Sequence, residues 1–188
     1  MCSLKLTQPP IEPFNVLAFD PGGTTGWAHA ISLSTNPSSL EEIEVYAGEF
    51  GPKEHYNELH EALIHWAHDA SVFEQPVPEI VFEPFHFRQH KDNPRQGLEL
   101  VSCEYIGVIK LACAQLGVTY YDRFVPGETK RYVTDKKLEM LGWLQTPITP
   151  MRHRNDALRQ LVKYLIVKKK VQHPITTAWR REDASSSD

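Results

Sequence analysis

Two carboxylates in this sequence stand directly after short apolar runs. Asp20 follows the run at residues 16–19, and Glu83 follows the run at residues 80–82. A continuous apolar run of this kind is typical of a strand that is buried on both faces. A carboxylate at the end of such a strand is costly to bury unless a cation lies against it. Asp20 and Glu83 are therefore candidate metal ligands, although Asp20 alone also fits an Asp-Pro pair that starts a turn.

A third source of ligands is the start of the last predicted helix. His153 and Asp156 are three residues apart, which places both side chains on one helix face with Cβ atoms about 5–6 Å apart. Taken singly, Asp156 also fits an acid that the helix dipole favours in the first turn, and His153 fits a surface residue. Together with the two strand-end acids they form a set of three carboxylates and one imidazole, which suits Mg²⁺ or Mn²⁺. Two such ions about 3.5–4 Å apart can bridge a phosphodiester and activate water, so the set predicts two-metal hydrolysis.

A polar segment with aromatic and basic side chains follows Glu83 immediately. Its cations are Arg88, Lys91 and Arg95, and they follow the aromatic side chains of Phe85 and Phe87. Aromatic rings can stack on unpaired bases while cations contact phosphates. The same composition also fits an ordinary surface loop. The segment is a candidate DNA contact beside the predicted metal site.

The charge of the chain is unevenly distributed. The formal net charge of the 188 residues is −4, yet residues 1–122 hold 6 Lys/Arg against 17 Asp/Glu, and residues 123–188 hold 14 against 7. A basic C-terminal third is compatible with an anionic partner such as nucleic acid, and equally with a solvated lysine-rich face. The hydrophobic content of 41% and charged content of 23% are ordinary for a soluble globular protein.

The elements that must position these residues follow from periodicity and turn residues. We expect an N-terminal lead-in at 1–13, one folded domain at 14–170 and a flexible tail at 171–188. The order of elements predicts a mixed α/β sheet whose first three strands are antiparallel and whose later strands are connected through helices. The predicted strands are 14–20, 26–33, 44–50, 80–83 and 118–125, and the predicted helices are 53–70, 96–116, one or two short helices within 128–143, and 153–169.

The predicted helix 96–116 is apolar on more than one face, so we expect it to cover the sheet and also to contact a second subunit. Glu104 within it either approaches the site or belongs to a helix face or interface. No apolar run approaches 18 residues, and the N-terminus lacks a basic region followed by an apolar one, which argues against membrane insertion and secretion. The three cysteines form no CxxC pair and suit a reducing compartment. We therefore expect a cytoplasmic protein.

Three motifs in a fixed order resemble the RuvC-type Holliday junction resolvases of the RNase H-like superfamily. They are DPGGTTGWA at residues 20–28, Glu83 at a strand end, and HRNDAL at residues 153–158. The resemblance spans about residues 14–170 and is nearest to the phage-encoded branch, which would place the protein in the host cytoplasm. It implies an RNase H-like five-stranded mixed sheet. It also implies a Mg²⁺-dependent endonuclease that cuts four-way junctions or other branched DNA as a homodimer through helix 96–116.

The resemblance also implies roles for the acidic residues. Asp20 would be the carboxylate shared by two metal ions, and Glu83 and Asp156 would each hold one of them. His153 occupies a position where the family has either Asp or His.

The basic residues receive roles from the same resemblance. Lys130 is similar to a lysine that contacts the scissile phosphate region, and Lys136 or Lys137 would take the second basic role.

Two other functions fit parts of the sequence. A non-catalytic branched-DNA-binding protein could use the same fold. The DPGGTTG turn at residues 20–26 also resembles the phosphate-binding turn of actin-like and sugar kinases, which are phosphotransferases. That fold needs a second, similar domain, for which 188 residues leave no room.

Overall fold

The computed structural model of the protein describes most of the chain. The described residues are 11–35, 37, 39–51, 55–84, 101–125, 127–146, 152–171, 174–177 and 179. The predicted DNA-contact residues Arg88, Lys91 and Arg95 lie outside them, as does most of the lead-in at 1–13. No helix in the described ranges combines the length and apolar character needed to cross a membrane.

Five strands form one mixed sheet, as the sequence predicted. Its spatial order is β3-β2-β1-β4-β5, with β1 at the centre. The pairs β1–β2 and β2–β3 are antiparallel, and β1–β4 and β4–β5 are parallel. The strands are β1 (Phe14–Asp20), β2 (Thr25–Ser32), β3 (Glu44–Phe50), β4 (Glu79–Phe82) and β5 (Tyr120–Tyr121).

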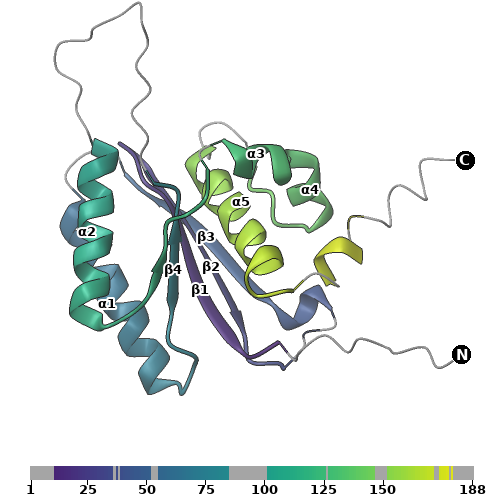
Figure 1. Ribbon diagram of the computed structural model, residues 1–188, viewed down its shortest axis with the longest axis horizontal. Coiled ribbons are helices and arrows are strands. Elements are labelled where there is room, and N and C mark those ends of the chain that lie inside the picture. Colours follow the sequence, from purple (N-terminus) through teal and green to yellow (C-terminus); the bar gives the residue numbers. More distant parts are fainter. Residues whose placement is uncertain are drawn as a thin grey trace, which may run out of the picture.

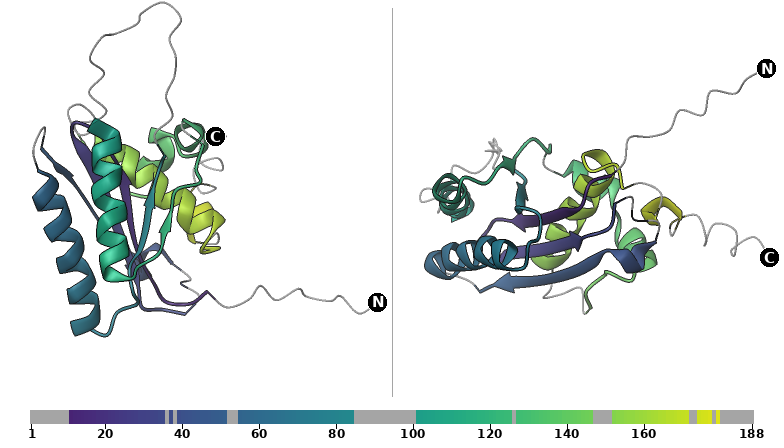
Figure 2. Two further views of the ribbon diagram at one scale, coloured as in Figure 1. Left: turned by 60° about the vertical axis from the view of Figure 1, so that its left-hand side comes forward. Right: turned by 90° about the horizontal axis from the view of Figure 1, so that it is seen from below.

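Helices cover both faces of this sheet (Figures 1 and 2). On one face, Leu17 and Phe19 of β1 pack with buried residues of α1 and α2, such as Leu63 and Ile109. On the other face, the alternate β1 residues pack with α5, and the short helices α3 and α4 lie on that side as well. Both faces of β1 are therefore buried, which explains its continuous apolar run. The helices are α1 (Tyr56–Val72), α2 (Val101–Leu116), α3 (Glu128–Tyr132), α4 (Asp135–Met140) and α5 (Arg152–Val167), with a 3₁₀ turn at Leu40–Glu42.

The fifth strand is much shorter than the predicted range 118–125. The N–H of Val118 donates to the carbonyl of Cys113 and so completes the C-terminal end of α2. Beyond Tyr121 the chain leaves the sheet, because Asp122 pairs with Lys110 of α2 at 3.1 Å and Phe124 enters the core. Local contacts with α2 thus replace sheet pairing at both ends of β5.

The folded unit continues past the predicted boundary at residue 170. Val171 and Ile175 are completely buried in the core. The indole N–H of Trp179 donates to the Lys137 carbonyl at 3.1 Å, and its ring packs edge-on against Tyr132. These apolar side chains anchor the beginning of the segment that the sequence predicted to be flexible.

The sheet register brings the two strand-end acids to the same edge. Phe19 of β1 pairs with Phe82 of the parallel strand β4, so Asp20 and Glu83 are the next residues on neighbouring strands. Carboxyl ends of parallel strands meet at one edge of a sheet. The backbone register therefore places Asp20 and Glu83, two of the four predicted metal ligands, at the same edge of the sheet.

Candidate active site

A single glycine allows the last helix to reach the acidic edge of the sheet. Gly26 lies opposite Asp20 at the start of β2, and the first turn of α5 passes directly over it. A Cβ atom at Gly26 would lie 2.0 Å from the carbonyl oxygen of His153 and 2.6 Å from the nitrogen of Arg154. No other residue type fits there without moving the helix. The glycine-rich turn thus serves close packing of α5 on the sheet.

The close approach brings His153 to Asp20, although the two are 133 residues apart in sequence. The Nδ1 atom of His153 lies 2.8 Å from Oδ2 of Asp20. Their hydrogen bond raises the pKa of His153, and partial burial of the ring acts in the opposite direction. With its proton on Nδ1, the imidazole donates to the carboxylate, so Asp20 has a hydrogen-bond partner against it, as a buried strand-end acid requires.

Two further contacts hold the first turn of α5 in place. The backbone N–H of Arg154 donates to Oε1 of Glu49 in β3 at 3.0 Å. The buried side chain of Asn155 accepts from the Gln145 N–H at 2.9 Å and donates to the Gln145 carbonyl at 3.0 Å. The first bond satisfies an amide group that a helix start leaves without an internal partner, and the other two tie α5 to the backbone of Gln145. They fix the position from which His153 projects.

Asp156 is the most buried acid of the site, with 5% of its surface exposed. Lys130 Nζ lies 2.7 Å from its Oδ2 atom, and Arg159 Nη1 lies 2.5 Å from its Oδ1 atom. Burial raises the pKa of Asp156, Lys130 lowers it, and the negative charge of Asp20 adds to the increase. Asp20 and Asp156 therefore influence one another electrostatically across the site.

Glu83 is connected to α3. The buried hydroxyl of Thr129 donates to Oε1 of Glu83, and Thr129 is followed directly by Lys130. This bond places the end of β4 next to α3, which itself packs against α5. The structure thus brings Asp20, Glu83, His153 and Lys130 to one end of the domain, together with Asp156.

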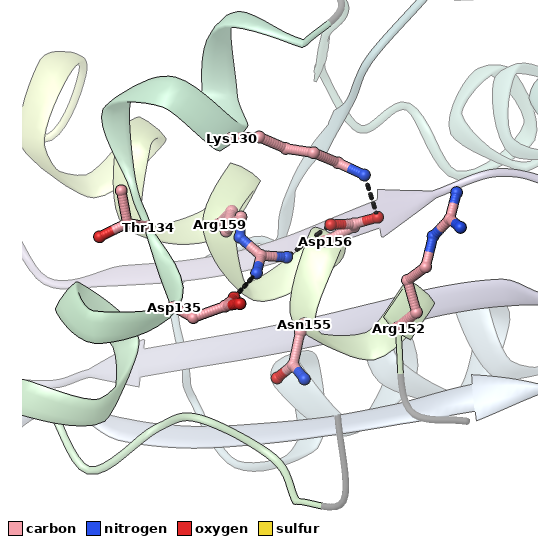
Figure 3. A pocket seen from close by; sticks show the side chains of 7 residues that line it. All are labelled: Lys130, Thr134, Asp135, Arg152, Asn155, Asp156 and Arg159. Carbon is pink, nitrogen blue, oxygen red and sulfur yellow. Dashed lines mark hydrogen bonds and ion pairs between the residues drawn. The ribbon is translucent and has the colours of Figure 1, made fainter. Parts of the chain in front are cut away.

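A pocket of about 400 Å³ opens beside Asp156 (Figure 3). Lys130 and Arg152 approach Asp156 from different elements, and Arg159 lies between Asp156 and Asp135. Three cationic and two acidic side chains line the pocket, so its walls are suited to an anionic ligand. The lining residues are Lys130, Thr134, Asp135, Arg152, Asn155, Asp156 and Arg159.

Other predicted site residues do not line this pocket. Lys137 donates to the Tyr132 carbonyl at 2.8 Å, and its ammonium lies 4.5 Å from the centre of the Trp179 ring. Lys136 is exposed on α4. Glu104 accepts a hydrogen bond from the Tyr56 hydroxyl of α1, which is the helix-face role considered from the sequence.

The donor set fits a divalent ion in chemistry, because carboxylate oxygens with one imidazole nitrogen are ligands that Mg²⁺ and Mn²⁺ accept. The described side chains are arranged in pairs: Asp20 with His153, Glu83 with Thr129, and Asp156 with two cations. Among the described residues, no three His, Cys, Asp or Glu side chains form a group that could hold a metal ion. A bound ion would therefore have to displace present partners from these carboxylate oxygens.

The fold of this chain is similar to that of RuvC in solved structures. One similar solved structure is RuvC from Thermus thermophilus, with a TM-score of 0.54, 15% identity, and coverage of 80% of this chain and 93% of that chain. Another is T. thermophilus RuvC in complex with a Holliday junction substrate, with a TM-score of 0.52, 18% identity, and coverage of 83% and 97%. No protein-family model matches the sequence, and no curated protein does. The predicted RuvC-like fold is confirmed.

Proposed function

We propose that this protein is a metal-dependent endonuclease that cleaves four-way junctions or other branched DNA. The observation that carries the proposal is the gathering of Asp20, Glu83, His153 and Asp156 at one end of a RuvC-like fold. The similar T. thermophilus RuvC has been solved with a Holliday junction substrate, which supports branched DNA as the substrate class.

The four residues would hold one or two Mg²⁺ or Mn²⁺ ions, Asp20 being central because it contacts His153 and its charge raises the pKa of Asp156. When bound, such ions supply Lewis acidity and an activated water for phosphodiester hydrolysis. His153 orients the Asp20 carboxylate through its Nδ1 atom. Thr129 orients Glu83 in the same way.

In this proposal Lys130, besides contacting Asp156, also binds the DNA backbone. Its side chain is 52% exposed and reaches Asp156 from α3, so it can exchange that carboxylate for a phosphate oxygen at little cost. Arg152 stands on the other side of Asp156 at the pocket rim. The two cations would bind the DNA backbone on either side of the acids.

We further propose that the active form is a homodimer through α2. Leu111 is 55% exposed on this helix, and its partly buried apolar residues include Ile106 and Val108. Two copies would present two cutting sites, as symmetric cleavage of a four-way junction requires. Sedimentation of the purified protein at several concentrations measures this; a monomer under conditions of full activity would refute it.

Incubation with a mobile four-way junction, a fork and linear duplex, each with Mg²⁺ or EDTA, tests the function. We expect paired nicks in the junction with Mg²⁺ and none with EDTA. Asp20→Asn should abolish cleavage and retain junction binding in a gel-shift assay. Wild-type rates in this variant would overturn the proposed chemistry.

A non-catalytic branched-DNA-binding protein is the second candidate. It is favoured by the occupation of both Asp156 oxygens by protein cations, which a purely structural acid would also show. Junction binding that neither Mg²⁺ nor Mn²⁺ converts to nicks would establish it.

A further inference from the structure

Arg159 lies one turn after Asp156 on α5 and is 8% exposed. Its Nη1 atom contacts Oδ1 of Asp156 at 2.5 Å, and its Nη2 atom donates to Asp135 of α4. One guanidinium therefore joins two carboxylates on different helices (Figure 3). The planar fork of arginine allows this double contact, which the single ammonium of lysine cannot reproduce in the same geometry.

The two oxygens of Asp156 have different partners. Oδ1 is bound by the buried Arg159, which is held in turn from its far side by Asp135. Oδ2 is bound by Lys130, whose long side chain is 52% exposed. Moving Arg159 would break both of its ion pairs, whereas Lys130 can leave into solvent. Oδ1 is thus the fixed oxygen and Oδ2 the one that can change partner.

We propose that Arg159, anchored by Asp135, is a positioning residue that fixes the rotation of Asp156 and directs its Oδ2 atom toward an incoming divalent cation. This inference rests on the proposed function. With Lys130 withdrawn, the pocket holds two carboxylates and two guanidinium groups, so its excess of positive charge is gone and a divalent cation can compete for Oδ2. Partners that orient a metal ligand commonly change metal affinity or activity about 10–100-fold when removed.

A structural role for Arg159 would give a different result, and α5 supplies a matched control. Lys163 lies one turn further along the helix, is 5% exposed, and has its Nζ atom 3.0 Å from Glu128 Oε2 of α3. Lys163→Met removes a buried cation that ties α5 to a short helix without touching Asp156. Both it and Arg159→Met are expected to lower the melting temperature.

The test measures Mn²⁺ binding to the DNA-free protein by calorimetry, together with kcat and KM for junction cleavage at varied Mg²⁺ concentration. We expect Arg159→Met to weaken Mn²⁺ binding by about 10-fold or more and to lower kcat with little change in KM. Arg159→Lys should recover part of the loss. Asp135→Asn, at a half-exposed position, should shift Mn²⁺ affinity in the same direction by a smaller factor.

Each outcome decides between the alternatives. Equal Mn²⁺ affinity in Arg159→Met and Lys163→Met would overturn the inference, and tighter binding in Arg159→Met would show that Arg159 competes with the ion instead of positioning its ligand. In both cases cleavage by the wild type would leave the proposed function intact. A wild-type protein that neither binds Mn²⁺ nor cleaves would overturn the proposed function and this inference together.

Discussion

The contact between Gly26 and the first turn of α5 gives a sharp prediction for Gly26→Ala. The added Cβ would lie 2.0 Å from the His153 carbonyl oxygen, whereas ordinary contacts begin at 3.4 Å. The helix start must therefore retreat by about 1.4 Å, the difference between these two distances. That movement is enough to break the 2.8 Å contact of His153 with Asp20 and the 3.0 Å bond from Arg154 to Glu49.

The expected effect on stability is that of an overpacked core, about 1–3 kcal/mol. For a chain of this size, each kcal/mol lowers the melting temperature by about 2–4 °C. Misplacement of a reacting group by about 1 Å costs on the order of 100-fold in rate. Gly26→Ala should therefore melt several degrees lower and cleave junctions about 100-fold more slowly, because His153 and Asp156 move with the helix start.

Gly23→Ala is the matched control, because it lies in the same turn and its added Cβ meets nothing within 4 Å. Thermal melting followed by circular dichroism gives the stability, and single-turnover junction cleavage gives the rate. We expect Gly23→Ala to match the wild type in both. Gly26→Ala that melts and cleaves like Gly23→Ala would refute the argument that α5 needs a bare backbone at Gly26.

Three further predictions concern His29, Asn155 and Lys130. Burial lowers the pKa of His29 from 6.5 to about 4; the unfolded state therefore binds the proton first, and stability that is complete above pH 6.5 falls by about 2–3 kcal/mol toward pH 4.5. Urea titrations should show His29→Gln losing less stability over this range. Asn155→Ala leaves two Gln145 backbone groups without their partner and should cost about 1–3 kcal/mol in urea unfolding. Lys130→Ala should reduce cleavage about 100-fold or more while Lys136→Ala changes it little.

Each of these has a contrary outcome. Parallel pH profiles for wild type and His29→Gln would show that His29 is protonated equally in both states. Unchanged urea midpoints for Asn155→Ala would show that the Gln145 connection does not hold α5. Equal cleavage by the Lys130 and Lys136 variants would remove the phosphate-contact role of Lys130.

The sheet and the strand-end acids were predictable because their signals are local. The continuous apolar run before Asp20 reflects burial on both faces of β1, and the similar run before Glu83 reflects its neighbour in the sheet. His153 was identified by its spacing from Asp156 on one helix face. For these residues, position within an element is enough to predict position in the fold.

The partners of these acids were not predictable, because they come from other elements. Arg159 stands among the apolar residues of α5 and shows no pattern of its own, yet it is buried because Asp135 of α4 faces it. Thr129 is an unremarkable helix residue until α3 is placed against Glu83. Glu49 reads as an ordinary strand residue, although it accepts from the first turn of α5. The contacts of these three residues depend on how distant elements pack together, which local sequence patterns do not encode.

Lys130 and Lys137 likewise differ in their tertiary contacts, which the sequence did not predict. Lys130 and Lys137 are equivalent in sequence as lysines of short helices. Lys130 reaches Asp156, whereas Lys137 is placed between the rings of Tyr132 and Trp179. One of these two rings, that of Trp179, comes from the C-terminal segment, which the sequence had suggested to be a mobile tail.

The bond between Asp20 and His153 also sets when this site can first exist during synthesis. Asp20 is synthesised 133 residues before its partner His153, which belongs to α5, the helix that packs across the central strands. Pairing across such a separation forms late in folding, because the intervening chain must be ordered first. A nascent chain therefore carries Asp20 without the geometry to use it until α5 has been made. The complete arrangement is acquired only after α5 has packed on the sheet.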